Sequence, residues 1–183
     1  MTLLEILEQD RSAVLERWRG LVLESYSEEA ACFFRGEKDR FQNPVGHSIA
    51  RATAVLYDGV VLDRQPEGIP EALESLVRLR AVQDFTASQA LAFVFQLKRA
   101  VREQAAQHPD VDRRWEELSR FETRIDALAF AAFDLYVESR ERIFEIRQGE
   151  LKRRIASLLR RLGGESEPEA EPIGSLGTGG RGA

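Results

Sequence analysis

The sequence predicts an all-α fold in which a helical bundle carries a long C-terminal helix that extends as a stalk. Apolar residues recur at intervals of three and four along most of the chain, a spacing that places them on one face of a helix. The 183 residues include only 6 prolines and 13 glycines, many of them in the last stretch. Runs that alternate β-branched and polar residues, which indicate strands, are nearly absent.

Composition and charge favour a globular chain with one buried core. The sequence is 43% hydrophobic and 31% charged, which excludes a disordered chain and a membrane protein. A net charge of -5 gives no general attraction to nucleic acid, so we expect no nucleic-acid partner. The apolar run at residues 127–133 is far shorter than the ~20 residues that span a bilayer, and it is typical of a buried helix segment.

The N-terminus and the cysteine content indicate a cytoplasmic chain. The first residues contain no basic region followed by an apolar stretch, so no secretory signal is predicted. A single cysteine, Cys32, excludes an internal disulfide and agrees with a reducing compartment. Because Cys32 lies beside Phe33 and Phe34, we expect it to be a buried packing residue rather than a redox sensor.

Capping residues mark the expected helix starts near the N-terminus. Thr2 and Glu5 have the spacing of a capping box, and Asp10 offers a second start. Five apolar residues after Asp10 share one helix face: Val14, Leu15, Trp18, Leu21 and Val22. A shorter helix is predicted over residues 27–34, and the charged residues 35–40 are expected to form a loop.

Asn43 followed by Pro44 predicts a helix start, because asparagine accepts from an unpaired backbone N–H and proline lacks the donor that would go unused. Helical spacing continues to Val60, and two prolines and a glycine in residues 63–70 then interrupt it. A helix is expected to resume at Ala72.

Thr86 and Gln89 form the next expected capping box, at the start of a core helix. Its broad apolar stripe contains Ala90, Leu91, Phe93, Val94, Phe95, Leu97, Val101 and Ala105. This helix is predicted to end at His108 and Pro109, because the residue before a proline is disfavoured in the helical region.

The C-terminal third divides into parts of different character. Between residues 112 and 162 there is no proline and Gly149 is the only glycine, so we expect one very long helix or two stacked ones. In its second half the following residues step by four and three, which is heptad spacing: Phe144, Gln148, Leu151, Ile155, Leu158 and Leu162. We predict a globular domain over 1–143, a stalk helix over 144–162 and a disordered tail over 163–183.

Three separated segments resemble the RsbRD N-terminal domain family. They are FQNPVGHSI at 41–49, RLRAVQDFTASQA at 78–90, and FDLY at 133–136 followed by IFEIR at 143–147. The resemblance covers roughly residues 3–154. It implies a globin-like helical sensory domain without haem, related to the dimeric RsbT co-antagonists of bacterial stress signalling. The STAS domain that usually follows in such proteins has no counterpart here, so its kinase-binding and phosphorylation functions are not carried over.

Six residues are candidate contacts for a ligand or a partner: His47, Arg80, Gln83, Asp84, Phe93 and Phe95. A ligand-binding or pH-sensing role for His47 competes with a hydrogen-bonded packing role, which we favour. The polar residues around Phe85 either hold a ligand or satisfy helix ends, and structural capping is the interpretation that we favour. Phe93 and Phe95 would supply the apolar part of a pocket.

The sequence contains no recognisable catalytic, cofactor or metal site. A phosphate-binding loop, a serine elbow and an HExxH pair are all missing, and carboxylate pairs such as Glu116 and Glu117 are expected to be solvated. Haem is not expected, because His108 adjoins a proline at a helix end and His47 lies early in the chain. We therefore expect no cofactor and no enzymatic activity.

These observations favour a regulatory domain that acts through protein–protein interaction in stress- or redox-linked signalling. We expect it to pair as a homodimer through the heptad segment. An alternative stays open, in which a haem-free globin-like pocket binds a small apolar ligand such as a fatty acid. The basic residues of the stalk are expected to form a solvated face with intrahelical ion pairs.

Overall fold

The computed structural model describes residues 2–36, 39–62, 64, 68–83, 85–108 and 115–163, with side chains as far as Arg161. Within these ranges the chain is helical and contains no strand. It divides into two units, Met1–Ile143 and Phe144–Ala183. The predicted all-α class with a long C-terminal helix is confirmed.

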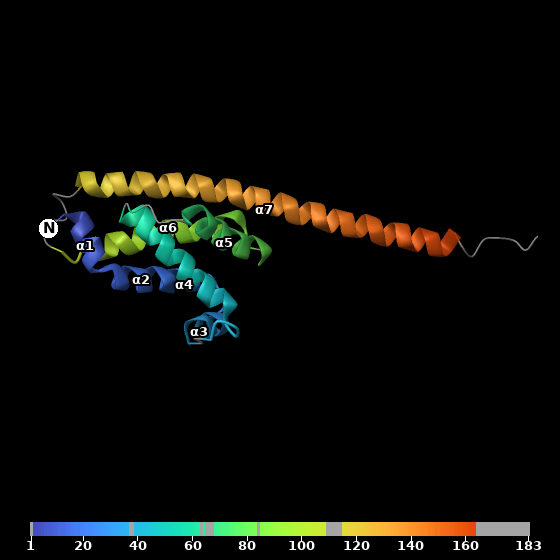
Figure 1. The fold of residues 1–183 in the computed structure, drawn as a ribbon, viewed down its shortest axis with the longest axis horizontal. Helices are drawn as coiled ribbons and strands as arrows, with labels where there is room; N and C mark the ends of the chain where they lie inside the picture. The colour runs from blue at the N-terminus through green and yellow to red at the C-terminus, as the bar shows by residue number, and fades with distance from the viewer. Residues whose placement is uncertain are drawn as a thin grey trace, which may run out of the picture. The chain divides into compact units, whose positions relative to one another are not determined.

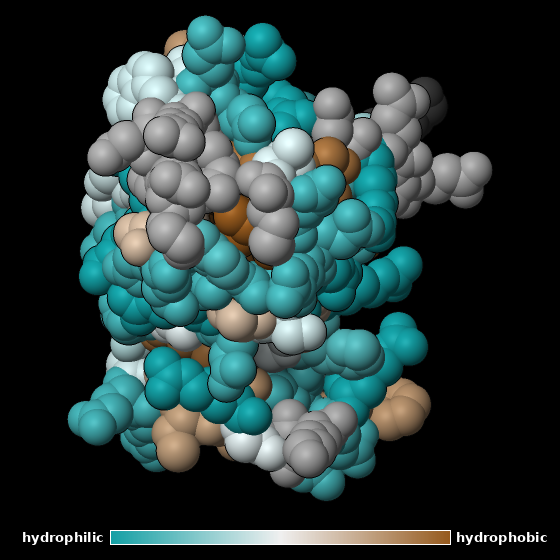
Figure 2. Space-filling view, turned by 90° about the vertical axis from the view of Figure 1, so that its left-hand side faces the viewer, coloured by the Kyte–Doolittle hydropathy of each residue, from teal (hydrophilic) through white to brown (hydrophobic). Residues whose placement is uncertain are grey.

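The described residues of the first unit form six α-helices, one π-helix and the first part of a seventh α-helix. In chain order the elements are α1 (Leu3–Gln9), α2 (Arg11–Leu23), α3 (Glu28–Gly36), α4 (Pro44–Leu56), η1 (Tyr57–Val61), α5 (Ile69–Val82), α6 (Ala87–Ala105) and α7 (Trp115–Gly163) (Figure 1). Helix α2 packs along α6, and α4 packs along α5. The face shown in Figure 2 is mostly hydrophilic, with scattered hydrophobic side chains.

Local capping explains where three of the helices begin. The Thr2 hydroxyl accepts from the N–H of Glu5, whose carboxylate accepts from the N–H of Thr2, so the predicted box is present. Thr86 and Gln89 form the same box before α6. Asn43 accepts from the N–H of Gly46 at 2.8 Å, which confirms the predicted start of α4.

Asp10 precedes α2 as predicted, but its side chain does not cap that helix. Its carboxylate instead accepts from Gln104 at 3.0 Å and lies 2.7 Å from Nε2 of His108. The hydrogen bond with His108, followed by that from Gln104, lowers the pKa of Asp10. The residue therefore ties the start of α2 to the end of α6 and to His108, which follows that helix.

The helical pattern expected to run through Val60 changes type after Leu56. Residues Tyr57–Val61 form the π-helix η1, and the Tyr57 side chain is fully buried. Its hydroxyl donates to the carbonyl of Leu7 at 2.8 Å, which fastens η1 to α1. Helix α3 is also longer than expected, because it continues through Gly36 into the segment that was predicted to be a loop.

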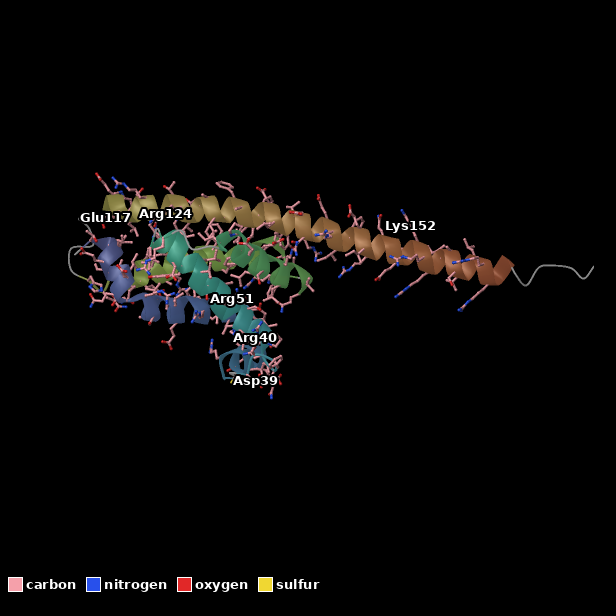
Figure 3. The ribbon with its side chains drawn as sticks, viewed as in Figure 1. Asp39, Arg40, Arg51, Glu117, Arg124 and Lys152 are labelled. Atoms are coloured by element: carbon pink, nitrogen blue, oxygen red, sulfur yellow. The ribbon has the colours of Figure 1, made fainter. Side chains whose placement is uncertain are left out.

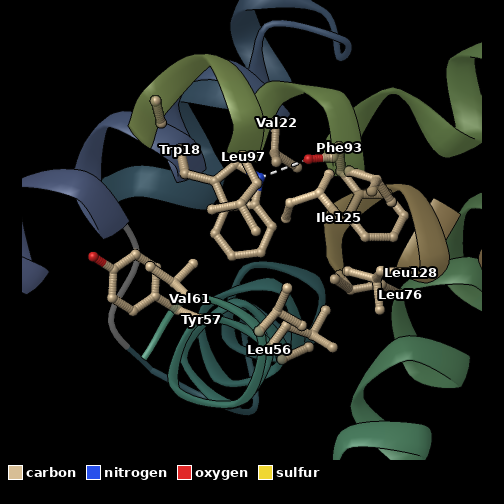
Figure 4. Close-up of a cluster of buried hydrophobic side chains, with 14 of the residues drawn as sticks. Trp18, Val22, Leu56, Tyr57, Val61, Leu76, Phe93, Leu97, Ile125 and Leu128 are labelled. Carbon is tan, nitrogen blue, oxygen red and sulfur yellow. Dashed lines mark hydrogen bonds between the residues drawn. The ribbon is translucent and has the colours of Figure 1, made fainter. Parts of the chain in front are cut away.

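The core lies where α2, α4, α5, α6 and α7 meet (Figure 4). Trp18 is completely buried, and its indole N–H donates to the carbonyl of Phe93 at 2.7 Å. Around this pair pack Val22, Leu56, Tyr57, Val61, Leu76, Leu97, Ile125 and Leu128. Burial of apolar side chains of this size is the main force that holds such a bundle together.

Two burial predictions are wrong. Cys32 is exposed, because α3 turns Ala31 toward the core and each following residue is rotated by about 100°. Within residues 127–133, Leu128 and Ala132 are buried, whereas Phe130 is 74% exposed. A helix at the surface buries one face only, so a continuous apolar run cannot be buried along its whole length.

Helix α7 is one continuous helix rather than two stacked ones. In the first unit, its Glu117 accepts from the N–H of Leu3 at 2.5 Å, and Arg124 donates to the carbonyl of Val61 at 3.5 Å (Figure 3). In the second unit, the Lys152 side chain projects outward from the helix (Figure 3). No helix in the described ranges combines the length and the apolarity that a membrane span requires. The expected disordered tail lies outside the described residues, apart from Gly163.

Candidate functional site

A buried arginine near the end of α5 forms the centre of the first candidate site. Arg80 has no exposed surface, although it lies only two residues before α5 ends at Val82. We call the surrounding cluster the Arg80 corner, and define it as Ser25, Tyr26, Arg80, Gln83 and Phe85. These residues come from the connection after α2, from α5 and its end, and from the connection before α6.

The Arg80 guanidinium has few partners for a buried charge. Nη2 donates to the hydroxyl of Ser25 at 2.5 Å. Cζ lies 4.8 Å from the ring centroid of Phe85 and 5.6 Å from that of Tyr26. Nε and Nη1 are buried and have no hydrogen-bond partner among the described residues. Burial lowers the pKa of Arg80, and none of the contacts described for its guanidinium is to a carboxylate that would offset the lost hydration.

Tyr26 covers this guanidinium and is held by its neighbours. Its ring meets Phe85 edge to face at 5.3 Å and 83°, and it meets Phe34 at 5.3 Å and 87°. The hydroxyl of Tyr26 donates to Oε1 of Gln83 at 2.9 Å, near the surface. Burial raises the pKa of Tyr26, so the phenol stays protonated and remains a donor at neutral pH.

The structure brings together two of the six sequence candidates. Arg80 and Gln83 both belong to the corner, while Asp84 lies outside the described residues. Phe93 is fully buried in the core and Phe95 is mostly exposed on α6. The described contacts of the corner include neither of these phenylalanines.

His47 lies elsewhere, exposed in the first turn of α4. It lines a cavity of about 490 Å³ together with Arg40, Phe41 and Arg51. Figure 3 shows Arg51 along α4 and Arg40 below it, toward α3. We expected His47 to be a hydrogen-bonded packing residue, and no contact described for its side chain supports that role.

Sequence reasoning missed Ser25 and Tyr26. Ser25 lies 55 residues from Arg80, and Tyr26 lies 57 residues from Gln83, so no local spacing links them. The only available signal was a tyrosine between two serines in a connection between helices. That pattern is common in ordinary turns.

A second candidate site is an exposed apolar row on the part of α7 in the second unit. We call it the α7 row and define it as Phe144, Leu151, Ile155 and Leu158. Each of these side chains is about half exposed or more, and Phe144 reaches 61%. Three of its positions, 144, 151 and 158, recur every seven residues. Such a narrow apolar stripe is the usual contact surface of paired helices.

A cavity of about 780 Å³ lies between α2, α3 and α4. Its apolar lining comprises Leu15, Leu23, Phe34 and Ile49. Arg19 also lines it, and this side chain donates to the carbonyl of Ala50 at 2.6 Å and to the hydroxyl of Thr53 at 2.9 Å. Neither Phe93 nor Phe95 lines this cavity, so it differs from the pocket expected from the sequence.

Metal-type clusters are missing from the part of the chain that the structure describes, since no three His, Cys, Asp or Glu side chains gather there. Comparison with known proteins identifies a family. The sequence model for the RsbT co-antagonist protein RsbRD N-terminal domain matches residues 12–151, which is more than half of the chain. No curated protein and no solved structure matches significantly. The chain therefore belongs to the RsbT co-antagonist protein RsbRD N-terminal domain family, a family of regulatory domains.

Proposed function

We propose that this chain is a non-enzymatic cytoplasmic regulatory domain that acts through protein–protein contact in stress- or redox-linked signalling. In this proposal it pairs with a second copy of itself through the α7 row. The family match supports the regulatory role. The observation that carries the pairing is the exposure of an apolar stripe at heptad spacing along the second unit.

Exposed apolar residues in this arrangement raise the free energy of the chain in water unless another helix covers them. Isolated helices are marginally stable in water, and a partner removes the apolar stripe from solvent. Phe144, Leu151 and Leu158 occupy one core position of the heptad, and Ile155 occupies the other. Two copies of the same stripe are complementary by symmetry, so a second copy is the simplest partner.

The charges beside the α7 row favour a parallel pair. Arg147, Arg154 and Arg161 follow one side at intervals of seven, while Glu145 and Lys152 follow the other side. In an antiparallel pair the two arginine sides would face each other and repel. In a parallel pair each arginine side faces the mixed side of the other helix.

Cysteine cross-linking of the full chain tests this arrangement. In a Cys32→Ser background, Leu151→Cys places a thiol in the α7 row, and parallel pairing brings two such thiols close enough for a disulfide. We expect oxidation to give a covalent dimer. Arg153→Cys in the same background is the control, because this position lies about 200° around the helix from Leu151. Equal cross-linking of both variants, or none at position 151, would contradict the proposal.

A second candidate function, the binding of a small apolar acid such as a fatty acid, is favoured by the cavity between α2, α3 and α4. Its volume of about 780 Å³ suits a small ligand. Arg19 on its wall has no carboxylate partner among the described contacts and can meet an acid group. A Cβ at Gly20, on the same wall, would meet nothing within 4 Å, so Gly20→Leu can fill the cavity. Native mass spectrometry with added decanoate should show an adduct on the wild type that this variant loses, and no adduct on either would exclude the function.

A further inference from the structure

We propose that the Arg80 corner is a binding site for a small carboxylate with an apolar body about the size of one aromatic ring, and that Tyr26 and Gln83 form the latch that closes it. This inference is independent of the pairing through the α7 row. It concerns the first unit only, and it gives a ligand class to two residues that the sequence singled out, Arg80 and Gln83.

The first argument is the unused hydrogen-bonding capacity of Arg80. A guanidinium has five N–H donors, and the N–H groups on Nε and Nη1 are buried without an acceptor among the described residues. Buried donors of this kind are rare, and each calls for an explanation such as a missing ion or ligand. No described carboxylate lies against Arg80, so the corner lacks the negative charge that would compensate for its burial.

The second argument concerns the charged side chains that the structure describes around the corner. Arg140 donates to the carbonyl of Ala81, the residue after Arg80, so a second guanidinium lies next to the corner. The Glu74 carboxylate on the same helix is paired with Arg78 at the surface, so it does not compensate the buried charge of Arg80. An anion is therefore the ligand that this environment favours.

The third argument is the chemical nature of the cover. Tyr26 lies above the guanidinium and packs edge to face on Phe34 and Phe85. If its ring turns outward, the space that it leaves adjoins the guanidinium and is bordered by the rings of Phe34 and Phe85. A ligand with an apolar body of that size and a carboxylate at one end replaces the contacts of the ring and adds the missing charge. A carboxylate also matches the planar edges of a guanidinium.

The fourth argument is that the cover is weakly fastened. Its only described hydrogen bond to a side chain is the one from the Tyr26 hydroxyl to Gln83, whose side chain is exposed, so water competes for it. The remaining contacts of the ring are apolar, and the ligand offers the same kind of contact. When the Tyr26 ring turns outward and the ligand binds, one set of aromatic contacts replaces another. The free energy of binding then comes from the charge pair between the ligand and Arg80.

Benzoate is the probe that matches this chemistry, and benzamide is its uncharged counterpart of the same shape. We expect titration calorimetry or two-dimensional NMR of the full chain to show millimolar or tighter binding of benzoate and at least tenfold weaker binding of benzamide. Inorganic phosphate, which has charge and no apolar body, should bind more weakly than benzoate. Equal binding of benzoate and benzamide would contradict a site built around Arg80.

Variants distinguish the role of Arg80, which we call the anchor because it binds the carboxylate, from the role of the latch. Arg80→Met removes the charge and should abolish benzoate binding, whereas the control Arg78→Met should leave it unchanged. Tyr26→Phe and Gln83→Ala keep the anchor and remove the latch, so each should tighten benzoate binding about two- to tenfold, as expected for the loss of one exposed hydrogen bond that holds the closed form. A purely structural role for Tyr26 predicts no such gain.

Three results would overturn the proposal. One is binding that persists in Arg80→Met. Another is the lack of benzoate binding by the wild type and by both latch variants, which also decides the matter if Arg80→Met does not fold. The third is binding that appears only in Asp84→Asn, because Asp84 would then be the native partner of Arg80.

Discussion

The side chain of Arg80 lies under Tyr26 and Phe85 with no carboxylate partner among the described residues. Loss of hydration destabilises its charged form, and cation–π contacts of about 0.5–2 kcal/mol each offset that loss only in part. An apolar side chain of similar length would avoid the penalty. A residue that lowers stability where a simpler one fits is typical of a functional position.

At this scale we predict that Arg80→Met raises the free energy of unfolding by about 1–3 kcal/mol, because replacement of a buried charge by an apolar group of similar volume is often neutral or stabilising. Urea unfolding followed by circular dichroism measures the change. The matched control Arg78→Met, at an exposed position of the same helix, should stay within about 0.5 kcal/mol of the wild type. A loss of several kcal/mol in Arg80→Met would mean that a partner compensates the charge.

The contacts of a single residue could be predicted from the sequence where its partner lies only a few positions away in the chain. Thr2 and Thr86 cap helices through residues three positions later, a spacing that is visible without a structure. The corner residues Ser25 and Tyr26 reach Arg80 and Gln83 from more than fifty positions away. Only the tertiary packing of the helices brings them together, and no local rule contains that information.

Among the elements, η1 is the one that the spacing of apolar residues did not predict. Tyr57, Val60, Val61 and Leu62 are all buried, and a regular α-helix cannot turn three consecutive side chains to one side. The π-turn inserts the extra residue that allows it. The burial of these side chains and the contact of Tyr57 with α1 depend on tertiary packing, so the sequence pattern alone indicated a continuing α-helix.

We predict that Tyr57→Phe lowers the free energy of unfolding by about 1–2 kcal/mol, because it removes a buried hydrogen bond to the Leu7 carbonyl and keeps the ring. Chemical denaturation of the purified variant gives the value. Tyr136→Phe is a useful comparison, since its hydroxyl donates to the carbonyl of Phe85 in a part-buried setting and should cost less. A neutral Tyr57→Phe would show that η1 does not depend on this contact.

Helices α2 and α6 are also joined by an ion pair that depends on pH. Glu103 accepts from Arg17 at 2.6 Å and from Arg99 at 2.7 Å, and these hydrogen bonds, that from Arg17 first, lower its pKa to about 2. Because the folded value lies below the ordinary one, the pair contributes stability above about pH 4.5 and loses it as the pH falls toward 2. Glu103 is partly exposed, so solvent screening keeps this contribution small.

The corresponding prediction compares the melting temperatures of the wild type and Glu103→Gln across pH. The wild type should melt higher at pH 6, and the gap should narrow below about pH 4.5 and close near pH 2. High salt at pH 6 should narrow it as well. A gap that stays constant from pH 6 to pH 2 would show that the charge of Glu103 does not stabilise the contact.

For the whole molecule, the helical class and the long C-terminal helix followed from the spacing of apolar residues and the scarcity of helix breakers. Which of those apolar residues face solvent did not follow. Phe130 and Cys32 were expected inside and are exposed, because burial depends on the neighbours of a helix and not on its own sequence. The α7 row lies in a segment whose heptad spacing was visible, and its exposure leaves an apolar surface for a partner.

The molar mass of the full chain in solution, measured by light scattering at micromolar concentration, tests the central claim most directly. We predict twice the 20.7 kDa of one chain for the wild type, and the mass of one chain for Leu151→Glu with Leu158→Glu. Arg153→Gln with Arg160→Gln changes the net charge equally on the opposite side of α7 and should remain dimeric. A monomeric wild type, or a dimer that survives both glutamates in the α7 row, would contradict the account.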